Sequence, residues 1–173
     1  MITIISGTNR KNSVSKKIAH IYQSILQDKG QKAEVIYLED LPADFVTTAL
    51  YENSGKNELF NPFRELIMQS QKMIFVVPEY NGSFPGVLKA FIDGMQYPHA
   101  FRDKKAALVG LSSGVQGAGL ALSHLTDIFN YCGMHVLAQK PKLARIEDNL
   151  SENKLSKLYH SLLEEQVEKL LIF

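Results

Sequence analysis

The sequence of 173 residues contains no tryptophan, a single cysteine and almost no excess of either charge. One cysteine, Cys132, cannot form an internal disulfide, which agrees with a reducing compartment. A net charge of +1, with the basic residues scattered, gives no support to a nucleic-acid partner. No apolar run approaches the roughly 20 residues of a membrane span, and the opening residues lack a signal peptide's pattern. These absences predict a cytoplasmic protein with no nucleic-acid or membrane partner.

Apolar residues make up 45% of the chain, enough for one core without disulfide or metal support. A chain of this length is typical of one domain, and no linker or internal repeat divides it. We therefore expect residues 1–173 to form a single domain.

Short apolar runs alternate with segments of helical periodicity. The runs expected as strands cover residues 1–6, 33–38, 73–77, 105–111 and 135–138. Strict alternation of strand and helix predicts a parallel five-stranded sheet in an α/β fold, with helices on both faces. In the common order 2-1-3-4-5, strands one, three and four are neighbours, so the loops that follow them meet at one edge. The aperiodic segment 39–58 is of the kind that often borders a site or a partner chain.

The loop after the first strand, Gly7 to Ser13, places polar groups at the start of a helix. The hydroxyl groups of Thr8, Ser13 and Ser15 and the guanidinium of Arg10, with free helical N–H groups, form a candidate phosphate cradle. An ordinary capped turn with a solvated arginine explains these residues equally well. The glycine spacings of P-loops and dinucleotide folds are absent, so a mononucleotide phosphate fits better than a pyrophosphate.

The loop after the third strand reads Glu79-Tyr80-Asn81-Gly82-Ser83 and leads into an amphipathic helix, with Pro85 in its first turn. Its backbone N–H groups could meet the heteroatoms of a planar ring while Tyr80 covers an apolar face. A plain Asn-Gly turn is the alternative.

The loop after the fourth strand runs from Ser112 to Gly119 and is rich in small residues. Ser113, Gly114 and Gly117 would let a ligand approach the backbone closely, although a flexible connector has the same composition. The histidines show no metal-ligand spacing, so no metal site is expected. Cys132 lies on an apolar helix face and is interpreted as a packing residue.

Taken together, the segments Gly7–Ser13 and Pro78–Lys89 resemble the NADPH-dependent FMN reductase family, which has a flavodoxin-like fold, a three-layer sandwich. The resemblance weakens after about Asp148. Two positions depart from the family pattern: Ser15 stands where asparagine is frequent, and Gly94 where an aromatic residue is frequent.

The resemblance implies which residues bind FMN. The first loop would hold the FMN phosphate, and the second would lie against the isoalloxazine. The third would close the edge of the flavin ring. The implied positions are, in turn, Thr8, Arg10, Ser13 and Ser15; Pro78, Glu79, Tyr80, Asn81, Gly82 and Ser83; and Ser113, Gly114 and Gly117.

The same resemblance implies a flavoprotein oxidoreductase. Hydride would pass from NADPH or NADH through bound FMN to a flavin, quinone, azo or metal-oxyanion acceptor, with no catalytic side chain because the cofactor carries the chemistry. A homodimer or homotetramer is expected by the same analogy. Two alternatives stay open: a flavodoxin-type electron carrier, and an FMN-binding module without turnover.

Overall fold

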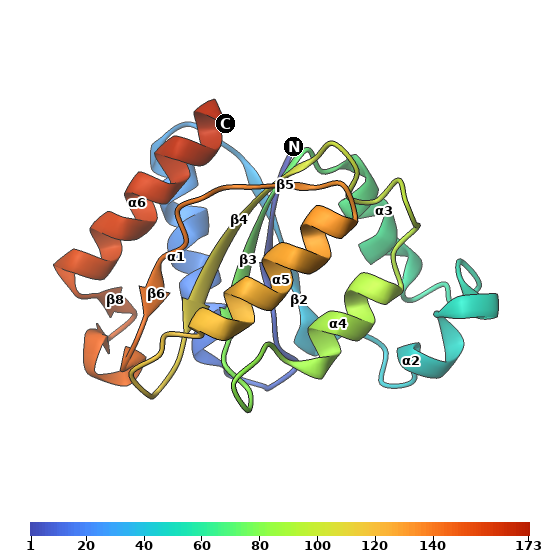
Figure 1. The fold of residues 1–173 in the computed structure, drawn as a ribbon, viewed down its shortest axis with the longest axis horizontal. Helices are drawn as coiled ribbons and strands as arrows, with labels where there is room; N and C mark the ends of the chain where they lie inside the picture. Colours follow the sequence, from blue (N-terminus) through green and yellow to red (C-terminus); the bar gives the residue numbers. More distant parts are fainter.

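The computed structural model describes residues 1–173 and contains one parallel sheet between two layers of helices (Figure 1). Its strands are β1 (Ile2–Ser6), β2 (Ala33–Tyr37), β3 (Lys72–Pro78), β4 (Lys105–Leu111) and β5 (His135–Val136), with β6 (Lys142–Leu143) also paired to β4. The order β2-β1-β3-β4-β5 confirms the predicted topology.

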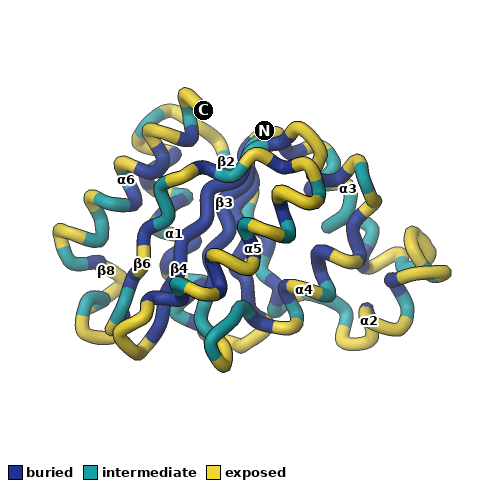
Figure 2. Tube along the Cα trace, viewed as in Figure 1, coloured by how far each residue is buried: buried dark blue, intermediate teal, exposed yellow.

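The helices divide between the two faces of the sheet. On one face, α1 (Val14–Asp28) and α6 (Lys157–Ile172) cover a core that includes Ile4, Ile74 and Val109. On the other, α3 (Asn61–Gln69), α4 (Gly86–Asp93) and α5 (Gly119–Tyr131) cover a second core around Phe75. Strands β1, β3 and β4 are buried almost throughout (Figure 2), because both of their faces are covered.

Local signals set most helix ends. The Ser13 side chain accepts a hydrogen bond from the Lys16 N–H at the start of α1, and Gly30 has the positive φ that ends the helix. Pro62 lies in the first turn of α3. Pro85 is the residue before α4 rather than part of its first turn, because its extended backbone (ψ 139°) leads into the helix.

The segment 39–58, expected as irregular, contains 3-10 turns at Leu38–Asp40 and Tyr51–Asn53 and a short helix, α2 (Phe45–Thr48). It packs into the core through Phe45, whose ring stacks on Phe60 at 5.3 Å. Gly94 lies under the same ring: a Cβ atom there would be 2.7 Å from Phe60. A glycine therefore stands where the family often has an aromatic residue because the phenylalanine fills that space.

The fifth strand is split. β5 ends at Val136, short of the predicted Ala138, and the chain leaves the sheet before β6 returns to pair with the end of β4. In between, the Gln166 amide of α6 donates to the Leu108 carbonyl oxygen at 2.9 Å. A side chain thus replaces the missing strand contact, which satisfies a buried carbonyl group. A small hairpin, β7 (Leu150–Ser151) and β8 (Lys154–Leu155), precedes α6.

Two lysines bind carbonyl oxygens at helix C-termini. Lys104 Nζ donates to Ile67 and Met68 at the end of α3, and Lys72 Nζ donates to Leu170 and Leu171 at the end of α6. An ammonium group there meets both the unpaired carbonyls and the negative end of the helix dipole. None of the helices combines the length and hydropathy needed to cross a membrane.

Candidate functional site

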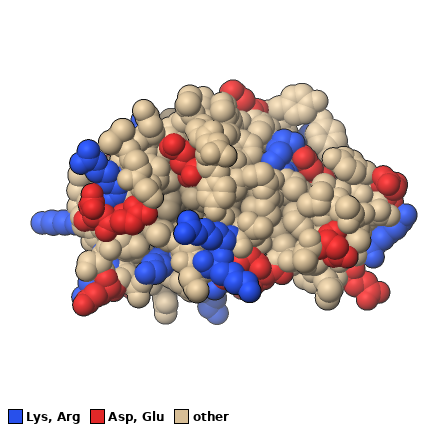
Figure 3. All heavy atoms as spheres, turned by 90° about the horizontal axis from the view of Figure 1, so that it is seen from below, with Lys and Arg blue, Asp and Glu red and all other residues tan.

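The loops after β1, β3 and β4 meet at the carboxyl edge of the sheet and line a cavity of about 380 Å³, which we call the edge cavity. Hydrogen bonds between neighbouring strands continue into these loops, since Gly7 N donates to Val76 O and Glu79 N to Leu111 O, both at 2.9 Å. Figure 3 shows this edge of the molecule, with blue side chains gathered near the middle. The lining residues are Thr8, Arg10, Lys11, Asn12, Ser13, Val14, Ser15, Pro78, Glu79, Tyr80, Leu111, Ser112, Ser113, Ile146 and Glu147.

The first loop turns tightly around Thr8. Its Oγ1 accepts a hydrogen bond from the Arg10 N–H at 3.2 Å, so the hydroxyl fixes the loop as it leaves the strand. Gly7 is required here because a Cβ atom would lie 2.8 Å from the Val76 carbonyl oxygen. The loop is therefore held against β3 before the helix begins.

Ser15 has a buried hydroxyl group without a protein partner. Its side chain is 1% exposed and its Oγ makes no hydrogen bond, although it lines the edge cavity in the first turn of α1. A buried polar atom without a partner costs free energy unless a ligand or water satisfies it. Its position beside helical N–H groups fits an oxyanion such as a phosphate.

The charge of the first loop is positive. The Arg10 guanidinium is exposed and has no acid partner, and Lys11 also lines the edge cavity. Lys16 pairs instead with Glu39, whose hydrogen bond raises the pKa of Lys16. Arg10 and Lys11 are thus the positively charged side chains of this loop that are available to a bound anion. Together with the hydroxyl groups, they fit the phosphate of a mononucleotide.

The second loop is a miniature hairpin. Asn81 and Gly82 both have positive φ (50° and 75°), as a type I′ turn requires, and the backbones of Tyr80 and Ser83 exchange two hydrogen bonds of 2.7 and 3.0 Å. Those two N–H groups are consequently occupied. Only the N–H groups of Asn81 and Gly82 within this turn remain without an acceptor.

Tyr80 reaches from the second loop to the first. Its hydroxyl group lies 2.8 Å from Thr8 Oγ1, in the phosphate cradle. The tyrosine therefore brings a hydroxyl group to the first loop, a contact that the sequence did not suggest.

Glu79 links the second loop to the third. Its Oε2 accepts a hydrogen bond from the Ala118 N–H at 3.0 Å, at the residue before α5, where Ala118 has a φ of 62°. In the same loop, Ser112 Oγ accepts from the Gly117 N–H at 2.9 Å and donates to Gly114 O. The third loop is thus braced from inside and from the neighbouring strand, rather than being a flexible connector.

The edge cavity does not contain every residue that the sequence singled out. Asn81, Gly82 and Ser83 lie in the adjoining hairpin, and Gly114 and Gly117 belong to the third loop but do not line the cavity. The other predicted positions line the cavity.

Residues outside the predicted set also contribute. Ile146 and Glu147 come from the segment after β6, and Ser113 Oγ donates to Glu147 Oε1 at 2.7 Å. Ser83 Oγ lies 2.9 Å from Nδ1 of His124 on α5. No three His, Cys, Asp or Glu side chains cluster so as to hold a metal ion.

Comparison with known proteins identifies related chains. The family model for NADPH-dependent FMN reductase matches residues 1–145. An NAD(P)H:quinone oxidoreductase of Solanum tuberosum is 30% identical over 139 residues, which are 80% of this chain and 71% of the relative. A 2-hydroxy-1,4-benzoquinone reductase of a Burkholderia species is 28% identical, over 82% of this chain and 76% of its own length. The fold is similar to that of an apo NADH:FMN oxidoreductase, with a TM-score of 0.83, 20% identity and coverage of 99% and 88%.

Proposed function

The chain belongs to the NADPH-dependent FMN reductase family and is an NAD(P)H-dependent flavin oxidoreductase, and from this premise we propose that quinones are its principal electron acceptors. The two relatives described above support a quinone as the acceptor, since one is named a quinone oxidoreductase and the other a benzoquinone reductase. A flavin, an azo compound or a metal oxyanion is a secondary acceptor, since a reduced flavin at an open edge reacts with many oxidants.

The phosphate of FMN binds in the first loop, and the observation that carries this assignment is the buried, unpartnered hydroxyl group of Ser15. Arg10 supplies a charged donor, while Thr8 and Ser13 supply further hydroxyl groups. The Tyr80 hydroxyl, 2.8 Å from Thr8 Oγ1, completes the ring of donors around the phosphate.

The flavin ring lies along the second loop, against Pro78 and the hairpin that follows it. The free N–H groups of Asn81 and Gly82 are the backbone donors available to ring heteroatoms. Ser113, Gly114 and Gly117 close the edge of the ring, and the carboxylate of Glu79 holds that loop in place through Ala118. Glu79 thus acts on the ring through the loop rather than by direct contact.

Bound FMN supplies the chemistry, by accepting a hydride from the nicotinamide nucleotide and passing electrons to the acceptor. The chain's own residues orient the ring and neutralise the phosphate. None of them needs to act as a nucleophile, acid or base, which agrees with the hydrogen-bonded state of Glu79 and Ser83 in the loops.

One anaerobic titration tests the reaction against its alternatives. Purified protein is mixed with FMN, then with NADPH or NADH, and finally with a benzoquinone, while the absorbance of flavin and nicotinamide is followed. We expect bleaching of the flavin by the nucleotide and its return with the quinone. Flavin binding without bleaching would indicate a binding module, and reduction only by an added reductase would indicate an electron carrier.

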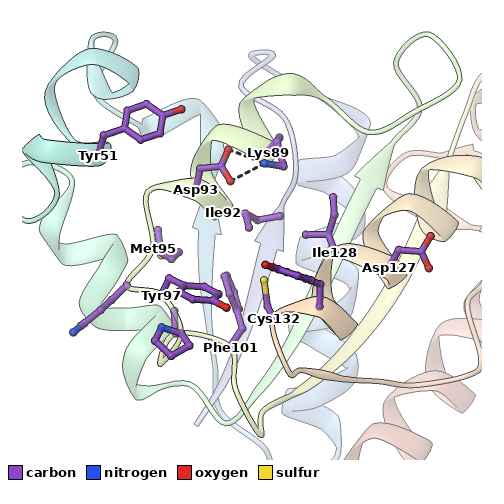
Figure 4. A pocket seen from close by; sticks show the side chains of 14 residues that line it. Tyr51, Lys89, Ile92, Asp93, Met95, Tyr97, Phe101, Asp127, Ile128 and Cys132 are labelled. Atoms are coloured by element: carbon purple, nitrogen blue, oxygen red, sulfur yellow. Dashed lines mark hydrogen bonds and ion pairs between the residues drawn. The ribbon is translucent and has the colours of Figure 1, made fainter.

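The protein forms a homodimer or a homotetramer through the face between α4 and α5. A cavity of about 550 Å³, the helix cavity, opens there (Figure 4) over an apolar floor that includes Ile92 and Phe101. Tyr51, Tyr97 and Tyr131 line it while remaining 76%, 67% and 81% exposed. Exposed aromatic side chains around an apolar centre are typical of protein interfaces.

Charged groups border this face. Lys89 and Asp93 form an ion pair at 2.7 Å (dashed in Figure 4), and Asp127 projects from α5. A face that carries both positive and negative charges suits a two-fold contact, because the same surface of two copies then meets and opposite charges can pair across it.

The oligomeric state is measured by light scattering. Tyr131→Lys should lower the molar mass of the assembly, whereas Leu158→Lys on α6, also at an exposed apolar residue, should leave it unchanged. A monomeric wild-type protein would contradict the proposal.

Residues 1–173 are proposed to act as a single FMN-binding domain, because both hydrophobic cores pack on the same sheet. The cytoplasm is the proposed location, since nicotinamide nucleotides are supplied there and the thiol of Cys132 is free.

A further inference from the structure

We propose that a cavity beside the N-terminal half of α5, lined by Lys140 and Lys142, binds the phosphate groups of the nicotinamide nucleotide. This lysine cavity has a volume of about 400 Å³ and lies between α5 and the excursion that interrupts the fifth strand. Gly119, Ser123 and Ala138 leave room between the two lysines and the helix. The inference deepens the proposed function, since it assigns a subsite for the electron donor.

The two lysines have no acidic partner. The ammonium groups of Lys140 and Lys142 form no ion pair and no hydrogen bond; Lys140 is partly buried, Lys142 is exposed, and both line the cavity. Burial lowers the pKa of Lys140, and no nearby acid offsets the effect. A partly desolvated ammonium group of this kind gains more from an arriving anion than a solvated one.

The lysine cavity and the edge cavity lie near opposite sides of one loop. A Cβ atom at Gly117 would be 2.8 Å from Lys142 Cβ, and one at Gly119 would be 3.6 Å from Lys142 Cδ, so the lysine side chain runs along the back of the third loop. Ser112 and Ser113 of that loop line the edge cavity. Figure 1 shows β6 beside the start of α5.

This arrangement matches the shape of a dinucleotide. Its nicotinamide must lie on the flavin ring, whose edge the third loop closes, so the remainder of the molecule has to pass that loop. Two ammonium groups just beyond it meet the phosphates as point charges. Asp127, eight residues along α5 from Gly119 and hence about 12 Å away, also lines the cavity. It would repel a phosphate but can accept hydrogen bonds from ribose hydroxyl groups.

The test combines a binding measurement with kinetics. Wild type, Lys140→Ala/Lys142→Ala and a matched control, Lys154→Ala/Lys157→Ala, are loaded with FMN and titrated with 2′,5′-ADP and with ADP by calorimetry. The control removes the same charge from exposed lysines near α6 that make no ion pair. We expect the cavity variant to bind the probes at least about tenfold more weakly, and the control to bind them as wild type does.

Kinetic constants separate the possible phosphates. A KM in the cavity variant that rises for both NADH and NADPH supports contact with the diphosphate. A KM that rises for NADPH alone supports contact with the 2′-phosphate. The FMN dissociation constant should stay unchanged in the same variant. Unaltered probe binding and unaltered KM for both nucleotides would overturn the inference while leaving the proposed function intact; a wild-type protein that oxidises neither nucleotide would overturn both.

Discussion

Gln166 Nε2 lies 2.9 Å from the carbonyl oxygen of Leu108, so a helix side chain completes the hydrogen bonding of a central strand. The same amide donates to Gln139 O at 2.9 Å, and its oxygen accepts from the buried hydroxyl group of Tyr22. One side chain therefore satisfies polar groups from α1, β4 and the excursion between β5 and β6.

Gln166→Leu should destabilise the fold strongly. The substitution leaves the Leu108 carbonyl and the Tyr22 hydroxyl buried without partners, and we expect the free energy of unfolding to fall by about 2–4 kcal/mol. Urea unfolding followed by circular dichroism measures it. Tyr22→Phe, which removes one of these bonds and keeps the ring, should cost less; an equal loss would show that the Tyr22–Gln166 bond, rather than the bonds to the two carbonyl groups, carries the effect.

Arg10→Ala should weaken FMN binding and leave the fold intact. Loss of a charge-assisted contact of about 1.5–3 kcal/mol raises the dissociation constant roughly 10- to 150-fold. Quenching of flavin fluorescence measures the affinity. Lys17→Ala, an exposed lysine of α1, serves as the charge control. An Arg10→Ala protein that binds FMN as wild type does would refute the phosphate assignment.

Ser15→Ala should separate binding from stability. Because the hydroxyl group has no partner in the protein, its removal should leave the unfolding free energy of the FMN-free protein unchanged or slightly higher. The FMN dissociation constant should rise by roughly tenfold. Thermal unfolding with and without FMN shows both effects, and Ser24→Ala is the control. A loss of stability without FMN would argue that the hydroxyl group is structural.

Glu79→Ala and Glu79→Gln should differ. Alanine leaves the Ala118 N–H without its acceptor, at a cost of about 1–3 kcal/mol, whereas glutamine retains an oxygen. We expect faster amide exchange at Ala118 and weaker FMN binding in the alanine variant only. If both variants lost affinity equally, the negative charge rather than the hydrogen bond would be the important property.

Lys104→Met should show a deficit in stability that grows with pH. Burial lowers the pKa of Lys104 below its usual 10.5, so between the two values the unfolded chain binds more protons than the folded one. The unfolding free energy of wild type therefore rises with pH through that window, and the variant lacks this contribution. Unfolding at pH 7 and at several alkaline values gives the difference, and a constant difference would contradict the assignment.

Local patterns were sufficient for most of the fold. Unbroken apolar runs identified β1, β3 and β4, because strands covered on both faces need apolar side chains throughout. The ends of α1 are also set locally, by the Ser13 cap and by the positive φ of Gly30. The meeting of the three loops followed from strand order alone.

Contacts between distant residues were not readable from the sequence. The fifth strand is split, and the hydrogen bond that β4 lacks there comes from Gln166, far along the chain. The hydrogen bond that joins Tyr80 to Thr8 in another loop has no signal in the sequence around either residue. Ile146 and Glu147 reach the edge cavity only because β6 returns beside β4, and no local pattern signals that return.

The excursion that separates β5 from β6 allows independent adjustment of the outer strand. Each half is anchored separately on β4, at Lys105–Ala106 and at Gly110–Leu111. Residues inserted into or deleted from the stretch between them would change its length without shifting either register. Such length variation would move Lys140 and reshape the lysine cavity while the central strands stay fixed, provided that the Gln139 carbonyl kept its hydrogen bond to Gln166.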